Sequence, residues 1–254
     1  MTKIIFSHIA LIIANTIYAV NYLFAKDVMP NYIQPSGFIL VRVIGAAVIF
    51  SLIHALFIKE KIIKKDLWYL IICALFGVVI NMLCFFEGLS ITSPINASLI
   101  MITTPLIVYL ISWTLFKEER EYKRFTGVVL GLFGAAILIT NGSSQFKIDN
   151  FGDVLIFLNA VSYAIYLILI KSMMKKYHPI TVLKIIFLVG LIIIFPFGWH
   201  ELSIVDFSIL PTQIFLKVLF VVLFTTCIAY FLNIYAIRIL KSSTVAFYIY
   251  LQPY

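Results

Sequence analysis

The sequence is poor in charged residues. Asp, Glu, Lys and Arg together make up 12% of its 254 residues, whereas soluble domains carry about 25%. Hydrophobic residues make up 63%, and the mean hydropathy is +1.10. A soluble core could not enclose so many apolar side chains, so the composition excludes an ordinary soluble domain. It predicts an all-α integral membrane protein surrounded by the lipid bilayer, because helices satisfy their own backbone hydrogen bonds in lipid.

The sequence also lacks the motifs of catalysis, metal binding and nucleic-acid binding. Its three cysteines (Cys73, Cys84 and Cys227) lie in apolar runs, without a CxxC pair or a Cys/His cluster. No HExxH, GxSxG or P-loop motif occurs, and the four histidines are far apart in sequence. The net charge is +8, but no basic run is long enough to follow a phosphate backbone. We therefore expect no enzyme activity, metal, cofactor or nucleic-acid partner.

Nine apolar runs divide the chain, and only short connections separate them. Crossing the hydrocarbon core takes about 20 residues, and most of the runs approach that length. The fifth run is short, and the ninth stops with the sequence. The runs are Ile4–Ala25, Pro35–Ile58, Leu67–Gly88, Pro94–Phe116, Phe125–Thr140, Asp153–Ile170, Val182–Trp199, Phe215–Ile237 and Ser243–Tyr254.

Lysine and arginine lie mostly on one side of these runs. Over the alternating connections, fifteen lie on the side of the N-terminus, and only Lys26, Lys147 and Lys217 lie on the other. Basic residues collect in cytoplasmic loops. The distribution therefore predicts a cytoplasmic N-terminus and leaves Arg42 inside the second run.

An internal repeat is visible at an offset of about 145 residues, which lays Tyr18 on Tyr163. Runs one to four match runs six to nine in order. Each unit has an odd number of spans, so the second copy enters the membrane inverted. We predict two inverted five-helix repeats, residues 1–145 and 146–254, forming a ten-helix fold. Nine of its helices are present, and the tenth is expected beyond Tyr254.

The stretch Thr92–Leu106 (TSPINASLIMITTPL) is unusually polar for a membrane helix. Between its two prolines lie small and polar residues, of which Asn96, Ser98 and Thr104 are candidates for a binding site. A weaker copy of the pattern occurs at Ser242–Pro253. A helix that faces only lipid needs none of these residues, whereas one that lines a cavity or meets other helices closely can use them. We expect the two stretches to meet across a central axis.

Polar side chains in the other spans predict a shared site. They are costly in lipid and therefore tend to face the bundle interior. Tyr and Asn recur at helical spacing in spans one and six, and their rings and amides suit a small organic molecule with a few hydrogen-bonding groups. The alternative is hydrogen bonding between helices, worth about 0.6 kcal/mol each. The candidate substrate-binding residues here are Tyr18, Asn21, Tyr22, Asn81, Tyr163, Tyr166, Tyr230, Asn233, Tyr248 and Gln252.

Arg42 and Glu87 are charged residues inside predicted spans, and several roles are open to them. Both could extend to the lipid headgroups, or they could pair with each other at an outer gate. Alternatively, Glu87 carries a coupling proton, or Arg42 meets an anionic substrate. Gly127 and Gly131 form a GxxxG motif, which serves either tight packing within the chain or a homodimer contact.

The sequence resembles the EamA-type transporters of the drug/metabolite transporter superfamily. The resemblance rests on TSPINASLIMITTPL in the fourth span, its echo ending in LQP in the ninth, and a glycine-rich fifth span followed by Asn141-Gly142. It implies two inverted five-helix halves, a central cavity, alternating access and a bacterial inner membrane. Family members often have Glu before the helix-nine proline, where this sequence has Gln252, so a charge is absent there.

The predicted function is a secondary transporter of a small organic metabolite, amino-acid-like or drug-like. Spans one, three, four, six, eight and nine are expected to line its path. The alternative is a membrane scaffold or assembly subunit, in which the polar residues serve only helix packing. The substrate, the direction of transport, the coupling ion and the oligomeric state remain open.

Overall fold

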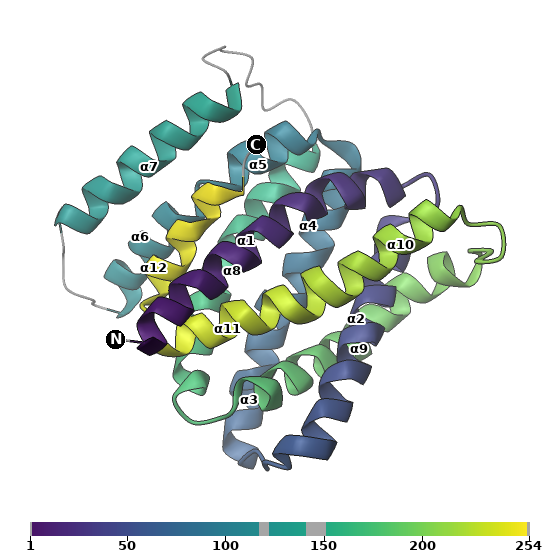
Figure 1. Cartoon of the computed structure of the whole chain (residues 1–254), viewed down its shortest axis with the longest axis horizontal. Helices are drawn as coiled ribbons and strands as arrows, with labels where there is room; N and C mark the ends of the chain where they lie inside the picture. The colour runs from purple at the N-terminus through teal and green to yellow at the C-terminus, as the bar shows by residue number, and fades with distance from the viewer. Residues whose placement is uncertain (1, 117–121, 141–150, 253–254) are drawn as a thin grey trace.

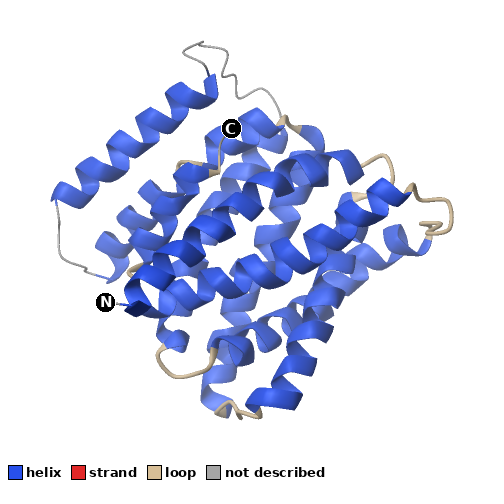
Figure 2. Ribbon diagram, in the orientation of Figure 1, coloured by secondary structure: helices blue, strands red, loops and turns tan. Residues whose placement is uncertain are grey.

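A computed structural model describes residues 2–116, 122–140 and 151–252, and these ranges are helical without a strand (Figure 2). The all-α prediction is confirmed for this part of the chain. The predicted features that lie outside the described residues are the turn at Asn141-Gly142, the basic residues Lys117, Arg120 and Lys147, the boundary at 145/146, and Pro253.

Seven helices in the described ranges are long and apolar enough to span a membrane. They correspond to seven of the nine predicted runs, and the other two runs form shorter helices. The seven are α1 (Thr2–Val28), α2 with η1 (Pro35–Ile53, His54–Ile58), α3–η2–α4 (Lys64–Ala74, Leu75–Val79, Ile80–Ile91), α5–α6 (Pro94–Met101, Thr104–Phe116), α8 (Phe151–Met174), α9 (Pro179–Ser203) and α10–η3–α11 (Thr212–Phe220, Val221–Ala229, Tyr230–Ile239). The shorter two are α7 (Tyr122–Thr140) and α12–η4 (Ser242–Phe247, Tyr248–Leu251).

Proline and a capping side chain begin two of these helices. Pro94 starts α5 and Pro179 starts α9, positions where the missing N–H has no intrahelical partner in any case. The hydroxyl of Ser93 accepts a hydrogen bond from a backbone N–H of α5, and the ring of His178 accepts one from α9. The connections before both helices are therefore fixed by local sequence.

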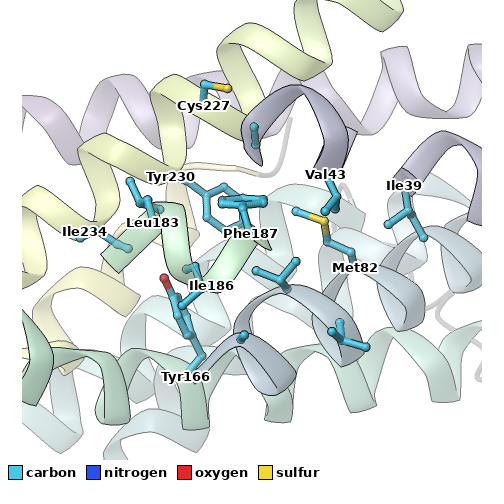
Figure 3. Packing of buried hydrophobic residues seen from close by; sticks show 14 of the residues in the cluster. Ile39, Val43, Met82, Tyr166, Leu183, Ile186, Phe187, Cys227, Tyr230 and Ile234 are labelled. Carbon is cyan, nitrogen blue, oxygen red and sulfur yellow. The ribbon is translucent and has the colours of Figure 1, made fainter. Parts of the chain in front are cut away.

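Helices of one half pack against helices of the other half (Figure 1). Helix α2 crosses α9, α4 packs on α8, and α1 packs on η3 and α11. Since α4 and α11 belong to equivalent spans, the last two contacts are images of each other under the repeat. Helix α7 lies at the periphery beside α6 and α5. One cluster of buried side chains runs through both halves; Figure 3 labels Val43, Met82, Tyr166, Phe187 and Tyr230 among them.

Two glycines mark a further pair of close contacts, α2 against η3 and α9 against η2. A Cβ on Gly45 of α2 would lie 2.4 Å from a methyl of Val222, and one on Gly190 of α9 would lie 2.6 Å from a methyl of Val78. The two glycines are 145 residues apart, which is the offset of the sequence repeat. A small residue lets the helix backbones approach closely, so the repeat is expressed as a repeated packing contact.

Four spans have irregularities that come in equivalent pairs, in addition to the π-helical segment η1 at the end of the second span. The third and eighth spans contain the π-helical segments η2 and η3. The fourth span is interrupted between Met101 and Thr104, and the ninth changes from α12 to the 3₁₀ turn η4. Interrupted helices and π segments often mark functional sites in membrane proteins, because they free backbone groups near the midplane. The breaks therefore direct attention to the space between these spans.

Candidate functional site

A cavity lies between the two halves, beside the interrupted helices. Side chains from α1, α2, α4, α5, α8, the η3–α11 span and the end of the ninth span line it. Its volume for the centres of water-sized molecules is about 70 Å³. One water needs roughly 10–15 Å³ on that scale, so the cavity holds on the order of five or six waters. The lining residues are Tyr18, Asn21, Tyr22, Arg42, Asn81, Met82, Phe85, Phe86, Met101, Asn159, Tyr163, Thr225, Tyr230 and Gln252.

Polar residues of spans one and six line this cavity. Asn21 and Tyr22 follow Tyr18 by three and four residues on α1, so both lie on the same side of that helix as Tyr18. Asn159 and Tyr163 have the same relation on α8. These two helices belong to different halves, and the repeat explains why their polar faces meet.

Asn81 and Tyr230 bring the two π-helical spans to the same wall. The Asn159 amide donates to the backbone oxygen of Asn81 at 2.7 Å, which fixes the amide orientation of Asn159. The Tyr230 hydroxyl donates to the carbonyl of Gly77, inside η2, at 3.2 Å. The π segment η2 thus has carbonyl oxygens that accept hydrogen bonds from polar groups of the other half.

Gln252 closes the wall near the end of the ninth span. Its Nε2 donates to Oδ1 of Asn15 at 2.7 Å, and its Oε1 accepts from the Tyr22 hydroxyl at 3.5 Å. The amide replaces the carboxylate that the family resemblance suggested. It can donate to one partner and accept from another, which a carboxylate could not do.

Arg42 lies in the cavity wall and not at the headgroup level, so extension to the lipid surface is not its arrangement here. Its side chain is only 2% exposed. Nε donates to Thr226 Oγ1 at 2.9 Å, and the guanidinium lies 4.2 Å from the ring centre of Phe86. The predicted pair with Glu87 is not formed, because Glu87 instead accepts a hydrogen bond from the Ser36 hydroxyl at 2.7 Å. Because Arg42 lines the cavity, span two contributes to the lining in addition to the spans that were expected to do so.

Three candidates from the fourth span do not line the cavity. The Ser98 hydroxyl donates back to the carbonyl of Ile95 at 2.8 Å, a bond within its own helix. Thr104 is fully buried at the start of α6, and Asn96 lies in the first turn of α5. The polarity of this stretch fits the helix break and its packing against other helices. As expected, the fourth and ninth spans do meet, through α6 and α12.

Three further candidates lie outside the lining. Asn233 donates to the Tyr163 hydroxyl at 2.8 Å and so supports a lining residue from behind. Tyr166 packs over Gly77, where a Cβ would come within 2.2 Å of its ring. The Tyr248 hydroxyl is 2.7 Å from the ring nitrogen of His8. These positions follow the helical period, but tertiary packing turns them toward neighbouring helices.

Sequence reasoning missed the apolar part of the wall. Met82, Phe85, Phe86 and Met101 carry no signal that separates a lining side chain from any other apolar residue in a membrane span. Thr225 was missed as well. It is a polar residue in an apolar run, and such residues were the signal that predicted lining residues in the other spans. Only the packing of the helices selects these residues.

Contacts between the halves close both ends of the bundle. At one end, Asp66 accepts hydrogen bonds of 2.8 Å each from Lys176 Nζ and the Tyr177 hydroxyl. The bond to Asp66 raises the pKa of Lys176. At the other end, Lys217 pairs with Asp27, and the N–H of Gly37 donates to Glu201 at 2.8 Å.

His178 lies at the first of these ends. Its half-buried position lowers the pKa of the imidazole, because burial disfavours the charged ring. The ring is therefore uncharged near neutral pH and can accept the hydrogen bond that caps α9.

Comparison with known proteins agrees with this arrangement. The sequence profile of the EamA-like transporter family matches residues 5–140 and again residues 150–254. The chain belongs to the EamA-like transporter family. The resemblance seen in the sequence is thereby confirmed.

Relatives of this EamA protein include transporters without an assigned substrate. An uncharacterized transporter of Archaeoglobus fulgidus is 27% identical over 252 residues, which are 97% of this chain and 85% of the relative. The uncharacterized transporter YetK of Bacillus subtilis is 27% identical over 188 residues, covering 71% of this chain and 57% of YetK. A solved crystal structure matches with a TM-score of 0.72 at 18% identity, covering 99% of this chain and 84% of that one, and so shows the shared fold.

The family and the apolar helices together make this EamA protein a multi-pass membrane protein of a transporter family. Its relatives are transporters by name.

Proposed function

We propose that this protein is a secondary transporter that moves a small organic metabolite by alternating access between its two halves. The observation that carries the proposal is the cavity itself. Tyr, Asn and Arg side chains of both halves surround it, next to helix interruptions that occur in equivalent spans. Binding sites at the interface of inverted repeats, beside broken helices, are a recurring transporter arrangement.

The size and chemistry of the cavity favour an amino-acid-like solute over a large drug-like one. Room for about five or six waters corresponds to a similar number of non-hydrogen atoms. Aromatic rings and methionine side chains supply apolar contact, while amide and hydroxyl groups supply hydrogen bonds. Such a combination orients a small molecule that has both kinds of surface.

The contacts at the two ends supply the gates. Asp66–Lys176 and Asp27–Lys217 each join one half to the other at opposite ends of the bundle. Opening toward one side requires breaking one set while the other holds. The charge distribution of the loops favours a cytoplasmic N-terminus, so the Asp66–Lys176 end would face the cytoplasm. The family resemblance favours a bacterial inner membrane.

Glu87 remains the candidate coupling group. It is half-buried near the end of α4, and Glu201 lies close enough to repel its charge. We expect Glu87→Gln to flatten the pH dependence of transport in proteoliposomes. An unchanged rate and pH profile would exclude Glu87 as the proton carrier.

A membrane scaffold is the second candidate, since several polar groups do bond between helices. Ser162 donates to the carbonyl of Phe76, and Ser242 to that of Leu167. The double variant Tyr18→Phe with Tyr163→Phe separates the two functions. It removes two cavity hydroxyls while it keeps both rings, so transport should fall while folding and membrane insertion persist. If the variant fails to assemble and the unmodified protein transports no metabolite of a broad export and uptake screen, the scaffold function is favoured.

A homodimer through α7 is the partner arrangement that we propose. Gly131 is already used within the chain, because a Cβ there would lie 2.5 Å from the ring of Tyr250. A Cβ added at Gly127 or at Gly134 would meet no neighbouring atom within 4 Å among the described residues. Cysteine cross-linking at Gly134 in membranes tests this contact, and a purely monomeric product would rule it out.

A further inference from the structure

Arg42 is a buried cation whose hydrogen-bonding capacity is mostly unused. Guanidinium groups stay charged in proteins and carry five N–H donors. Within residues 2–116, 122–140 and 151–252, only Nε has a protein acceptor, Thr226 Oγ1, and that hydroxyl in turn donates to the carbonyl of Val221. Nη1 is fully buried and has no acceptor among these residues. A buried donor without a partner costs about 1–3 kcal/mol, and more when it is charged.

No carboxylate in the described ranges lies within ion-pairing distance of Arg42. The ionisable groups that face it are Tyr18, Tyr230 and Cys227, and phenols and thiols are uncharged near neutral pH. The rings of Phe86 and Phe38 provide only cation–π contact, at 4.2 and 5.9 Å. A charge inside a membrane protein normally pairs with an opposite charge. The part of the chain that the structure describes supplies none here.

The same cavity holds acceptors without donors. Oδ1 of Asn159 and Oδ1 of Asn21 are both buried and have no hydrogen-bond partner. For Asn159 the assignment is fixed, because its Nδ2 donates to the carbonyl of Asn81. The residues that line the cavity therefore include one cationic donor on α2 and two amide oxygens without a donor among the described residues, on α8 and α1.

We propose that the central cavity binds a small organic carboxylate that also carries a hydrogen-bond donor, with the carboxylate on Arg42 Nη1 and the donor on Asn159 Oδ1. The statement names the substrate class of the proposed transporter and rests on that function. Arg binds carboxylates through paired N–H groups, which gives both energy and orientation. A hydroxyl or ammonium group on the neighbouring carbon supplies the donor, and Asn21 Oδ1 accepts a second bond. The ligand then provides the counter-ion that the protein lacks.

The first experiment uses the unmodified full chain in lipid nanodiscs and measures binding by calorimetry and by the shift in thermal unfolding. Lactate, alanine and 2-aminobutyrate are compared with lactamide, which lacks the charge, and with propionate, which lacks the donor. We expect the carboxylates with a donor to bind at least about tenfold more tightly than lactamide and severalfold more tightly than propionate. Equal binding of lactate and lactamide, or no binding by any carboxylate of the set, overturns the proposal.

Variants test the assignment to Arg42. Arg42→Gln should abolish the preference for lactate over lactamide, while Arg42→Lys should keep the preference with weaker binding, since a lysine retains the charge but not the paired N–H groups. Arg238→Gln is the matched control, because Arg238 is an exposed arginine outside the cavity. If Arg42→Gln does not fold, Arg42→Lys and the comparison of ligands on the unmodified protein decide the question. Retained charge preference in a folded Arg42→Gln protein contradicts the proposal.

Transport in proteoliposomes separates this inference from the proposed function. If the carboxylates bind with the expected selectivity but none is transported, the assignment of the site stands and the transporter function fails. If only uncharged or cationic solutes are transported, and equally well by Arg42→Gln, the function stands and the inference fails.

Discussion

Helices α2 and α9 occupy equivalent places in the two halves, but one equivalent position carries a charged residue in α2 and an aromatic residue in α9. Each approaches its neighbour closely through a glycine, Gly45 or Gly190. Three residues before these glycines, α2 carries Arg42 and α9 carries Phe187. Arg42 lines the cavity, whereas Phe187 is fully buried and packs against the ring of Tyr230 with 5.3 Å between ring centres.

The difference separates what the repeat determines from what it does not. Helix crossings and interruptions recur in both halves, because they follow from small residues and backbone geometry. Among the residues that line the cavity, the charged side chain comes from the first half, so the cavity has a cationic wall and a neutral one. A ligand that binds it has one preferred orientation even though the scaffold around it is symmetric.

The largest expected effect tests the shared packing. Gly45→Leu and Gly190→Leu each force a side chain against a valine of the facing helix, and overpacking typically costs about 1–3 kcal/mol or more. We expect both variants to lose stability to a similar degree in thermal unfolding of the detergent-solubilised protein. Gly127→Leu is the control, because that site has open space. A large loss in only one of the two would show that the crossings are not equivalent.

The next effect tests the neutral counterpart of Arg42. Phe187→Leu shortens a fully buried ring and should cost about 1–2 kcal/mol of stability through the space it leaves. Because Phe187 carries no charge, the preference of the cavity for lactate over lactamide should stay within about twofold of the unmodified value. Nanodisc binding measures the preference, and its loss in a folded Phe187→Leu protein would place the charge selectivity elsewhere.

Smaller effects are expected from the ion pairs that join the halves at the two ends. Lys176→Gln and Lys217→Gln each weaken one end, so they should bias the protein toward opening at opposite sides. Exposed ion pairs are weak, and we expect roughly two- to fivefold changes in the accessibility of engineered cysteines at each end. Identical labelling patterns in the two variants would argue against a gate at either pair.

The smallest effect concerns the cap of α9. The pKa of His178 is lowered in the folded protein, so its stabilising contribution is present above the ordinary value of 6.5 and is lost as pH falls through the lowered pKa. Protonation removes the acceptor that caps the helix, at a cost of about 1 kcal/mol or less. His178→Asn keeps an acceptor at all pH values. We expect it to reduce the acid loss of thermal stability, and an unchanged pH profile would contradict the capping role.

Much of the fold was predictable because lipid imposes simple rules. The apolar runs predicted the seven helices of membrane-spanning length and the two shorter ones in the described residues. Pro94 and Pro179 marked the starts of α5 and α9. The repeat at an offset of 145 was visible from residues such as Tyr18 and Tyr163, which line the same cavity. The prediction of a further helix concerns residues beyond Tyr254 and stays a prediction.

The binding site was less predictable. The helical period indicates which side chains share one face of a helix, but it does not indicate which other helix packs against that face. Ser98 has the spacing of a lining residue, but its hydroxyl bonds within its own helix. The sequence suggested an ion pair between Glu87 and Arg42, but the Glu87 carboxylate instead accepts a hydrogen bond from the Ser36 hydroxyl. The methionine and phenylalanine residues of the wall look like any lipid-facing side chain until the helices are packed.

The sequence by itself determined that this chain lies in a membrane as helices, that it repeats, and that its polar residues must avoid lipid. These properties follow from local composition and from the helical period of polar residues, because each side chain that faces lipid must be apolar on its own account. Only the tertiary structure decided which polar groups satisfy one another and which remain free. It brought Arg42 to the cavity without a counter-ion, because the pairing of buried charges depends on distances between helices that sequence spacing does not contain.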